Sequence, residues 1–198
     1  MVDDFLKIEG SSAVIDDFVL LSEILQNTHK TTSLWKWALI CLHNGLQGLM
    51  VLALQGSNGL KTLRPEDLIK WHEAIENGTK PPANLKLDDF LNLYKKIKSD
   101  KMLQNINSKQ FKPNGTQGGA IKQLNRLRNE FIHFTPKLWY LELEGLPHIA
   151  TDCLDVAEFL AWESGNVYLF NRELIEKLKT AFSSIRKSLD LLCEKTAG

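Results

Sequence analysis

The sequence predicts an all-α protein, with residues 1–198 forming a single domain that is a bundle of about six or seven helices. Apolar residues recur at spacings of three and four along most of the chain, which is the period of a helix buried on one face. No region is rich in strand-like alternation, and clusters of Gly, Pro, Asn and Ser separate segments of helical length. The chain has 198 residues and is 43% hydrophobic, so it can bury a sizeable core.

Two helices are predicted before residue 60. Ser11 and Ser12 can cap the first, whose apolar positions run through residues 14–25. The hydroxyls of residues 31–33 can cap the second, at residues 34–54, which has the length of a membrane span. Its interior contains polar residues and glycines, namely Lys36, His43, Asn44, Gly45, Gln47 and Gly48. These residues favour the buried central helix of a soluble bundle, and no membrane association is expected.

The middle of the chain is less regular. Residues 64–78 form a predicted helix with Pro65 and two acids in its first turn, and residues 87–97 form a short one. Residues 104–119 are rich in Asn, Ser and Gly, and this length indicates a mobile functional loop or an insertion. Together these features predict a variable helical and loop insertion at about 60–116 within the domain.

Three further helices complete the prediction. The first occupies residues 117–135, and residues 138–143 alternate enough to form a short extended piece. The last two helices span residues 146–164 and 171–195, and Asn171 is a natural cap for the second of them.

Charge is balanced overall but unevenly distributed. The net charge is zero, so no global field draws the protein to nucleic acid or to a membrane. Residues 94–128 nevertheless contain nine basic residues and one acid, whereas residues 139–165 contain six acids and no Lys or Arg. This asymmetry is compatible with a local anion-binding face and equally with two ordinary solvated helix faces.

The cysteines and the missing motifs limit the classes of function. Cys41, Cys153 and Cys193 are odd in number and widely spaced, and without a signal peptide they indicate reduced thiols in a cytoplasmic protein. No metal-ligand spacing, nucleotide P-loop or nucleophile elbow is present, so neither a metal nor a cofactor is expected.

One segment concentrates possible chemistry at the end of the helix predicted at residues 117–135. Arg128 supplies a permanent cation with a planar fork of donors, Asn129 follows it, and His133 can transfer a proton near neutral pH. Pro136 then stops the helix. The expected core stripe of this helix is Ile121, Leu124, Leu127, Phe131 and Phe134. The three polar residues lie beside that stripe, where an Arg and a His most often cap carbonyls or sit in solvent.

This segment resembles the HEPN superfamily of helical ribonucleases and nucleotide-binding domains. The family pattern is an Arg followed by a polar residue, with a His after four to six intervening residues, and Arg128, Asn129 and His133 match it. An all-helical chain and an earlier long helix with polar residues on a buried stretch also fit the family. The resemblance covers residues 34–195.

The resemblance implies a homodimer that acts as a metal-independent endoribonuclease, as a toxin or a component of phage defence. The paired His133 side chains would transfer protons, the paired Arg128 forks would hold the phosphate, and Asn129 would orient His133 or donate to the phosphate. The RNA backbone would be bound by Lys109, Lys112, Lys122 and Arg126. An antitoxin protein is a possible partner, although Thr135 replaces a tyrosine that some toxin members carry for modification.

Two other readings of the same residues stay open. The chain can be a module of the same fold that binds RNA or a nucleotide, or that serves in a larger complex, without turnover. It can also be a helical scaffold in which Arg128 and His133 only cap their helix.

Overall fold

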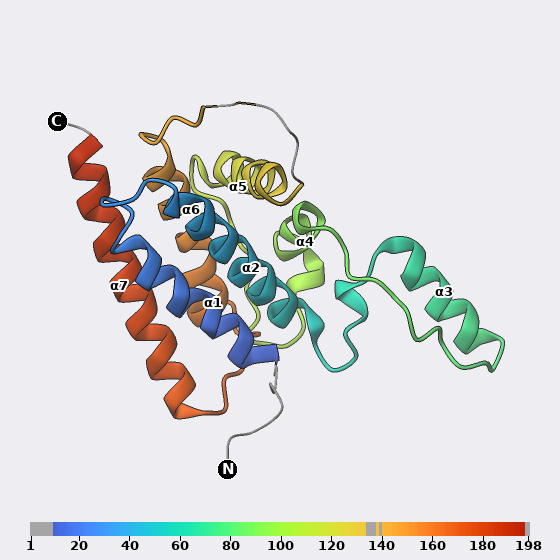
Figure 1. Cartoon of the computed structure of the whole chain (residues 1–198). Helices are drawn as coiled ribbons and strands as arrows, with labels where there is room; N and C mark the ends of the chain where they lie inside the picture. Colours follow the sequence, from blue (N-terminus) through green and yellow to red (C-terminus); the bar gives the residue numbers. More distant parts are fainter. Residues whose placement is uncertain (1–9, 134–137, 139, 197–198) are drawn as a thin grey trace, which may run out of the picture.

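The computed structural model describes residues 10–133, 138 and 140–196, and the predicted all-α fold of about seven helices in one domain is confirmed (Figure 1). The α-helices of this described part are α1 (Gly10–Leu25), α2 (Leu34–Gln55), α3 (Pro65–Glu76), α4 (Phe90–Ile97), α5 (Gln117–Ile132), α6 (Leu146–Glu158) and α7 (Arg172–Thr196). Short turns of other helix types are η1 (Leu60–Thr62), η2 (Asp100–Met102) and η3 (Phe159–Glu163). The described residues contain no strand, only an isolated bridge between Leu63 and Leu87.

Helix α2 is the centre of the bundle. It contacts α1 on one side and α4, α5 and α6 on the others, while α7 packs against α1 and α6 (Figure 1). Among the described helices, α2 alone is long and apolar enough to cross a membrane. Its side chains Leu39, Leu46 and Met50 are nevertheless completely buried against the neighbouring helices. The composition of α2 is therefore that of a core helix.

Two glycines allow α1 to approach α2 closely. A Cβ added at Gly45 would lie 2.8 Å from the ring of Phe18, and one added at Gly48 would overlap the side chain of Val14. Both contacts are with buried residues of α1. Because glycine has no side chain, the backbone of α2 can contact the side chains of α1 directly at these positions. The cost is the weaker helix propensity of glycine.

Helix α3 stands on an arm that projects from the bundle (Figure 1). Only Asp67 and Ala74 of this helix are buried, and they lie against the arm's own returning segment. At the base of the arm, the Arg64 amide donates to the Lys86 carbonyl at 3.1 Å and the Asp88 amide donates to the Thr62 carbonyl at 2.8 Å. The range 60–116 thus contains a projecting arm followed by core structure, because α4 packs against α2.

The segment expected to be a mobile loop is packed and hydrogen-bonded. Asn166 is buried behind it, accepts a hydrogen bond from the Ser108 hydroxyl at 2.6 Å and donates to the Met102 carbonyl at 2.7 Å. Phe111 is buried against Tyr94 and Phe159. Contacts with residues distant in sequence therefore hold the first half of the segment 104–119, which the composition predicts to be a mobile functional loop or an insertion.

Several helices begin at positions or with caps that differ from the prediction. Ser11 and Ser12 lie inside α1 and do not precede it. Backbone turns lead into α2, and the Ser33 side chain makes no cap hydrogen bond. By contrast, Asn171 caps α7 as predicted, since its side-chain oxygen accepts from the Glu173 amide at 2.8 Å.

The other differences concern α5, α6 and the segment between them. Helix α5 ends at Ile132, and Phe134, Thr135 and Pro136 lie outside the described residues. Residues 138 and 140–142 have no regular secondary structure, so the described part of the predicted extended piece is irregular. The helix predicted to reach residue 164 changes at Glu158 into the π turn η3, which the Ser164 amide closes onto the Phe159 carbonyl.

Candidate functional site

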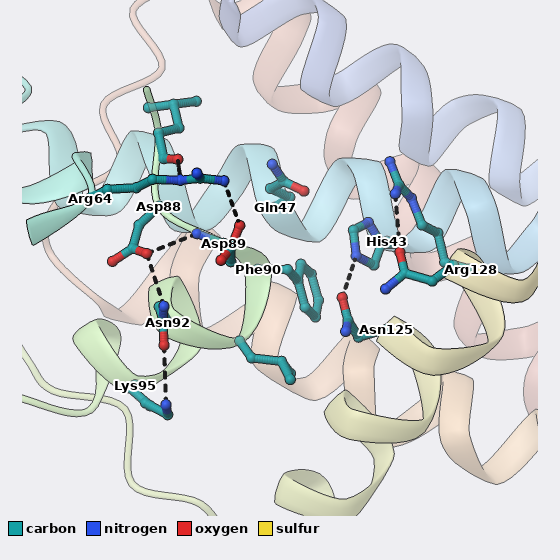
Figure 2. Close-up of a pocket in the computed structure, with 13 residues that line it drawn as sticks. His43, Gln47, Arg64, Asp88, Asp89, Phe90, Asn92, Lys95, Asn125 and Arg128 are labelled. Carbon is teal, nitrogen blue, oxygen red and sulfur yellow. Dashed lines mark hydrogen bonds and ion pairs between the residues drawn. The ribbon is translucent and has the colours of Figure 1, made fainter. Parts of the chain in front are cut away.

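A cleft of about 630 Å³ opens between α2, α4, α5 and the base of the arm (Figure 2). Its lining consists mainly of polar and charged side chains: His43, Gln47, Arg64, Leu87, Asp88, Asp89, Phe90, Leu91, Asn92, Lys95, Asn125, Arg128 and Asn129. Four separate stretches of the sequence therefore converge on it, at residues 43–47, 64, 87–95 and 125–129. Convergence of charged and amide groups in a concave site is typical of a binding site for a polar ligand.

Helical geometry explains which residues of α5 face this cleft. At 100° per residue, Lys122, Arg126, Asn129 and His133 fall within about 40° of one line on the helix surface. Asn125 and Arg128 are rotated from that line toward α2 and α4, where they line the cleft. Asn129 sits between these two faces and also lines the cleft. Helix α5 thus presents one polar face to the cleft and an adjoining cationic face to solvent.

Arg128 is a partly buried cation with no carboxylate partner among the described residues. Its Nη1 donates to the Asn129 side-chain oxygen at 3.2 Å. Its Nε is buried and has no hydrogen-bond partner within the described part of the chain. Because Arg128 lines the cleft and has no carboxylate partner among the described residues, its charge favours an anionic ligand there.

His43 lies at the floor of the cleft and is only 2% exposed. Its ring stacks on Phe90 with centroids 3.9 Å apart, and its Nε2 lies 3.3 Å from the Asn125 side-chain oxygen. Burial lowers the pKa of His43 to about 4, the Asn125 hydrogen bond opposes this shift, and the nearby positive charge of Arg128 adds to it. The ring is therefore neutral at physiological pH. Nε2 donates to Asn125, and the side chain of Asn44 also opposes the lowering of the His43 pKa.

The opposite end of the cleft contains charges that neutralise one another. Arg64 lies 2.9 Å from the Asp89 carboxylate. Buried Asp88 lies 2.7 Å from the Lys96 ammonium and also accepts from Asn92 at 3.0 Å. Burial alone would raise the pKa of Asp88, but the hydrogen bonds from Lys96 and Asn92 lower it overall. Asp88 is therefore ionised, and both acids are already paired with a cation of the protein.

The structure separates the three residues of the predicted catalytic motif. Arg128 and Asn129 line the cleft, whereas His133 is exposed at the end of α5 and is not among the lining residues. The His133 amide donates to the Asn129 carbonyl at 2.9 Å, which fixes the backbone of the motif. Within one chain the arginine and the histidine are thus presented on two adjoining faces.

The predicted RNA-binding residues are exposed but lie outside the cleft. Lys122 and Arg126 belong to the outer face of α5, and Lys109 and Lys112 precede that helix. The acids of residues 139–165 lie elsewhere, and none lines the cleft. Two of them, Asp155 and Glu158, instead hold Arg186 of α7 at 2.8 and 2.6 Å.

Sequence reasoning missed several residues of the cleft. His43 and Gln47 were notable as polar residues four apart in an apolar helix, which is the signal that could have assigned them to a shared site. Arg64, Asn92 and Asn125 carry no comparable signal, because each is a common residue on an ordinary helix or turn. Only the packing of α4 and α5 against α2 brings them together.

The cations and amide groups that line the cleft are hydrogen-bond donors, which suit an anion better than a metal ion. The described residues contain no group of three or more His, Cys, Asp or Glu side chains that could hold a metal.

Comparison with protein-family models, with curated proteins and with solved structures gives no match for this chain. The resemblance to the HEPN superfamily therefore stays a prediction.

Proposed function

We propose that this protein is a homodimeric, metal-independent endoribonuclease whose active site combines Arg128, Asn129 and His133 of two subunits. The observation that carries the proposal is the Arg128 guanidinium, which lines the cleft and has no carboxylate partner among the described residues. His133 is exposed on the adjoining face of the same helix. A second subunit placed against this face would bring its own motif to the same phosphate.

The chemistry follows from these groups. The 2′-hydroxyl attacks the adjacent phosphorus, so the 2′-O–P bond forms, the P–5′-O bond breaks, and the product end is a 2′,3′-cyclic phosphate. One group must accept the 2′-hydroxyl proton and another must donate a proton to the leaving 5′-oxygen. His133 and the partner's His133 would take these two roles. The guanidinium of Arg128 would stabilise the charge that develops on the phosphate oxygens.

The outer face of α5 suits the flanking RNA. Lys122 and Arg126 are exposed and lie in line with His133, so a strand that reaches His133 passes these two cations. Lys109 and Lys112 extend the basic surface before α5. Phosphate contacts of this kind make binding strongly salt-dependent.

A non-catalytic module that binds RNA or a nucleotide is the second candidate. The observation that favours it is the position of His133 outside the cleft, together with a cleft histidine that is neutral and buried. In that case the cleft binds its ligand without turnover, and His133 has no chemical role.

A cleavage assay on purified protein separates the two candidates. Wild type in EDTA should cut cellular RNA to fragments ending in 2′,3′-cyclic phosphate, whereas His133→Ala and Arg128→Ala should not. His72→Ala, an exposed histidine on the arm, is the matched control and should cleave normally. Absence of cleavage by folded wild-type dimer would leave the binding module as the function.

The proposed biological role has its own test. Expression of the wild type in a bacterial host should arrest growth, and His133→Ala should not, if the activity serves as a toxin or in defence. Equal growth with both proteins would argue against that role, whatever the outcome of the cleavage assay. Analytical ultracentrifugation of the purified wild type would show whether the dimer exists.

A further inference from the structure

Resting on the proposed function, we propose that a second cavity binds an unpaired base of the RNA beside the cleaved phosphate. The cavity has a volume of about 350 Å³ and opens between α5 and the segment that leads into α6. This volume lies inside the range of about 300–1,000 Å³ that small-molecule sites occupy. The lining residues on which the proposal depends are Gln123, Arg126, Leu127, Tyr140, Glu142 and Leu146.

The rotation of α5 places this cavity beside the face that carries His133. At about 100° per residue, Arg126 and His133 lie within about 20° of one line on the helix surface. Gln123 and Leu127 are rotated from that line to one side, where they line the cavity. Arg128 is rotated to the other side, where it lines the cleft. A strand that reaches His133 therefore has the cleft on one side and the cavity on the other.

The apolar part of the lining suits a flat ring. Leu127 and Leu146 are buried and give the cavity an apolar wall. Tyr140 also lines the cavity and is 89% exposed, so the protein covers little of its ring. Unpaired bases of RNA stack on aromatic side chains that are open in this way.

The polar part of the lining suits a base better than a phosphate. Arg126 and Glu142 contribute one charge of each sign, so a phosphate in the cavity would meet a carboxylate as well as a guanidinium. A base instead carries both donors and acceptors on its edge, which Glu142, Gln123 and Arg126 can match. The cavity is therefore assigned to a base, and the phosphates follow the face of α5 that carries Lys122.

Binding of RNA to an inactive protein tests the base site without cleavage. The full chain with His133→Ala, here the parent, is titrated with a labelled single-stranded RNA of mixed sequence and followed by fluorescence anisotropy. Addition of Tyr140→Ala should weaken binding about tenfold, as expected for the loss of one base stacked on an aromatic ring. Tyr140→Phe should bind like the parent, because stacking needs the ring and not the hydroxyl. Tyr168→Ala, at an exposed tyrosine outside the cavity, is the matched control and should stay within about twofold of the parent.

Filling the cavity is a second test that removes no side chain. Gly145 lines the cavity with a φ of −78°, which suits any residue, and a Cβ added there meets no atom within 4 Å. Gly145→Leu should therefore keep the fold and exclude the base, so it should weaken binding about as much as Tyr140→Ala. Gly10→Leu, at another glycine with open space and outside the cavity, should bind like the parent. Circular dichroism of each variant checks that it is folded.

Duplex RNA of the same sequence shows whether Tyr140 contacts a base. The bases of a duplex are paired and stacked on one another, so Tyr140→Ala should leave the affinity for the duplex within about twofold of the parent. An equal loss of affinity for single-stranded and duplex RNA would mean that Tyr140 contacts the backbone, and it would overturn the base site.

Failure of this inference and failure of the proposed function are distinguishable. If the wild type cleaves RNA but Tyr140→Ala and Gly145→Leu bind single-stranded RNA as tightly as their controls, the cavity is not a base site and the ribonuclease proposal stands. If no RNA is cleaved but binding depends on Tyr140 and Gly145 as expected, the base site stands as that of a binding module. If the folded protein binds no single-stranded RNA, the inference is wrong, and the cleavage assay alone judges the proposed function.

Discussion

The imidazole of His43 on α2 and the carboxamide of Asn125 on α5 meet at the floor of the cleft, with Nε2 3.3 Å from Oδ1. This contact joins residues that are 82 positions apart and fixes the neutral tautomer of a buried histidine. It also places that histidine beside Arg128, whose charge disfavours a second cation. A structural hydrogen bond and the electrostatics of the candidate site are therefore coupled.

Acidification should destabilise the protein through His43. The pKa of His43 is lowered from 6.5 to about 4 in the folded chain. The stabilising contribution is therefore complete above the unfolded pKa and is lost as the pH falls from about 6.5 toward 4, because only the unfolded chain takes up the proton. The full effect is about 3 kcal/mol at most, from 1.36 kcal/mol per pKa unit.

Urea unfolding of wild type and His43→Gln between about pH 7.5 and pH 4.5 measures this effect. The free-energy difference between the two proteins should shrink as the pH falls, since glutamine does not titrate. A difference that stays constant over the whole range would mean that His43 is not held neutral.

Replacement of Arg128 by methionine should not lower the stability of the protein. Arg128→Met removes a partly buried cation whose Nε has no partner among the described residues and keeps most of the side-chain volume. The free energy of unfolding should stay unchanged or rise by about 1 kcal/mol, because the desolvation cost of the charge disappears. Arg126→Met, at an exposed position of the same helix, should change stability by less than about 0.5 kcal/mol. A loss of about 1 kcal/mol in Arg128→Met alone would instead support the helix-capping role.

The ion pair at the base of the arm should be essential for folding. Lys96→Met leaves the Asp88 carboxylate buried without its cation, which should cost about 3–5 kcal/mol. The double variant Asp88→Asn with Lys96→Met should recover part of this loss, because no uncompensated charge then remains. Thermal unfolding of the single variant Lys96→Met and of the double variant measures this recovery. Equal melting temperatures of these two proteins would show that Asp88 and Lys96 are not energetically coupled. Lys98→Met, at an exposed position, serves as the control.

Two glycine substitutions should have opposite signs. Gly48→Ala places a methyl group against the β-branched side chain of Val14, so the overpacking should destabilise the protein by about 1–3 kcal/mol. Gly119→Ala lies in the first turns of α5 with open space around it, so the better helix propensity should stabilise by up to about 1 kcal/mol. Equal effects in urea unfolding would contradict the close packing of α1 on α2.

The local features of the helices were readable from the sequence. Of the predicted apolar stripe, Ile121, Leu124 and Leu127 are completely or nearly completely buried, Phe131 is partly buried, and Phe134 lies outside the described residues. The range of α2 and the cap of α7 by Asn171 were also predicted correctly, apart from one residue at an end. These features depend on side chains three or four positions apart, and such neighbours are set by helix geometry alone.

Features that depend on distant contacts needed the tertiary structure. The segment 104–119 has a loop-like composition, yet buried Asn166 holds it by accepting hydrogen bonds from Ser108 and Asn105. Similarly, nothing local to Arg64 or Asn92 distinguishes them from ordinary surface residues, and the packing of α4 against α2 gives them a place in the cleft.

For the candidate site, the sequence by itself determined the spacing of Arg128, Asn129 and His133 on one helix. Only the tertiary structure decided that Arg128 turns into a cleft beside His43 while His133 faces solvent at the helix end. The physical reason is that rotation about one helix axis follows from residue number, whereas the neighbours of each face follow from how α2, α4 and α5 pack.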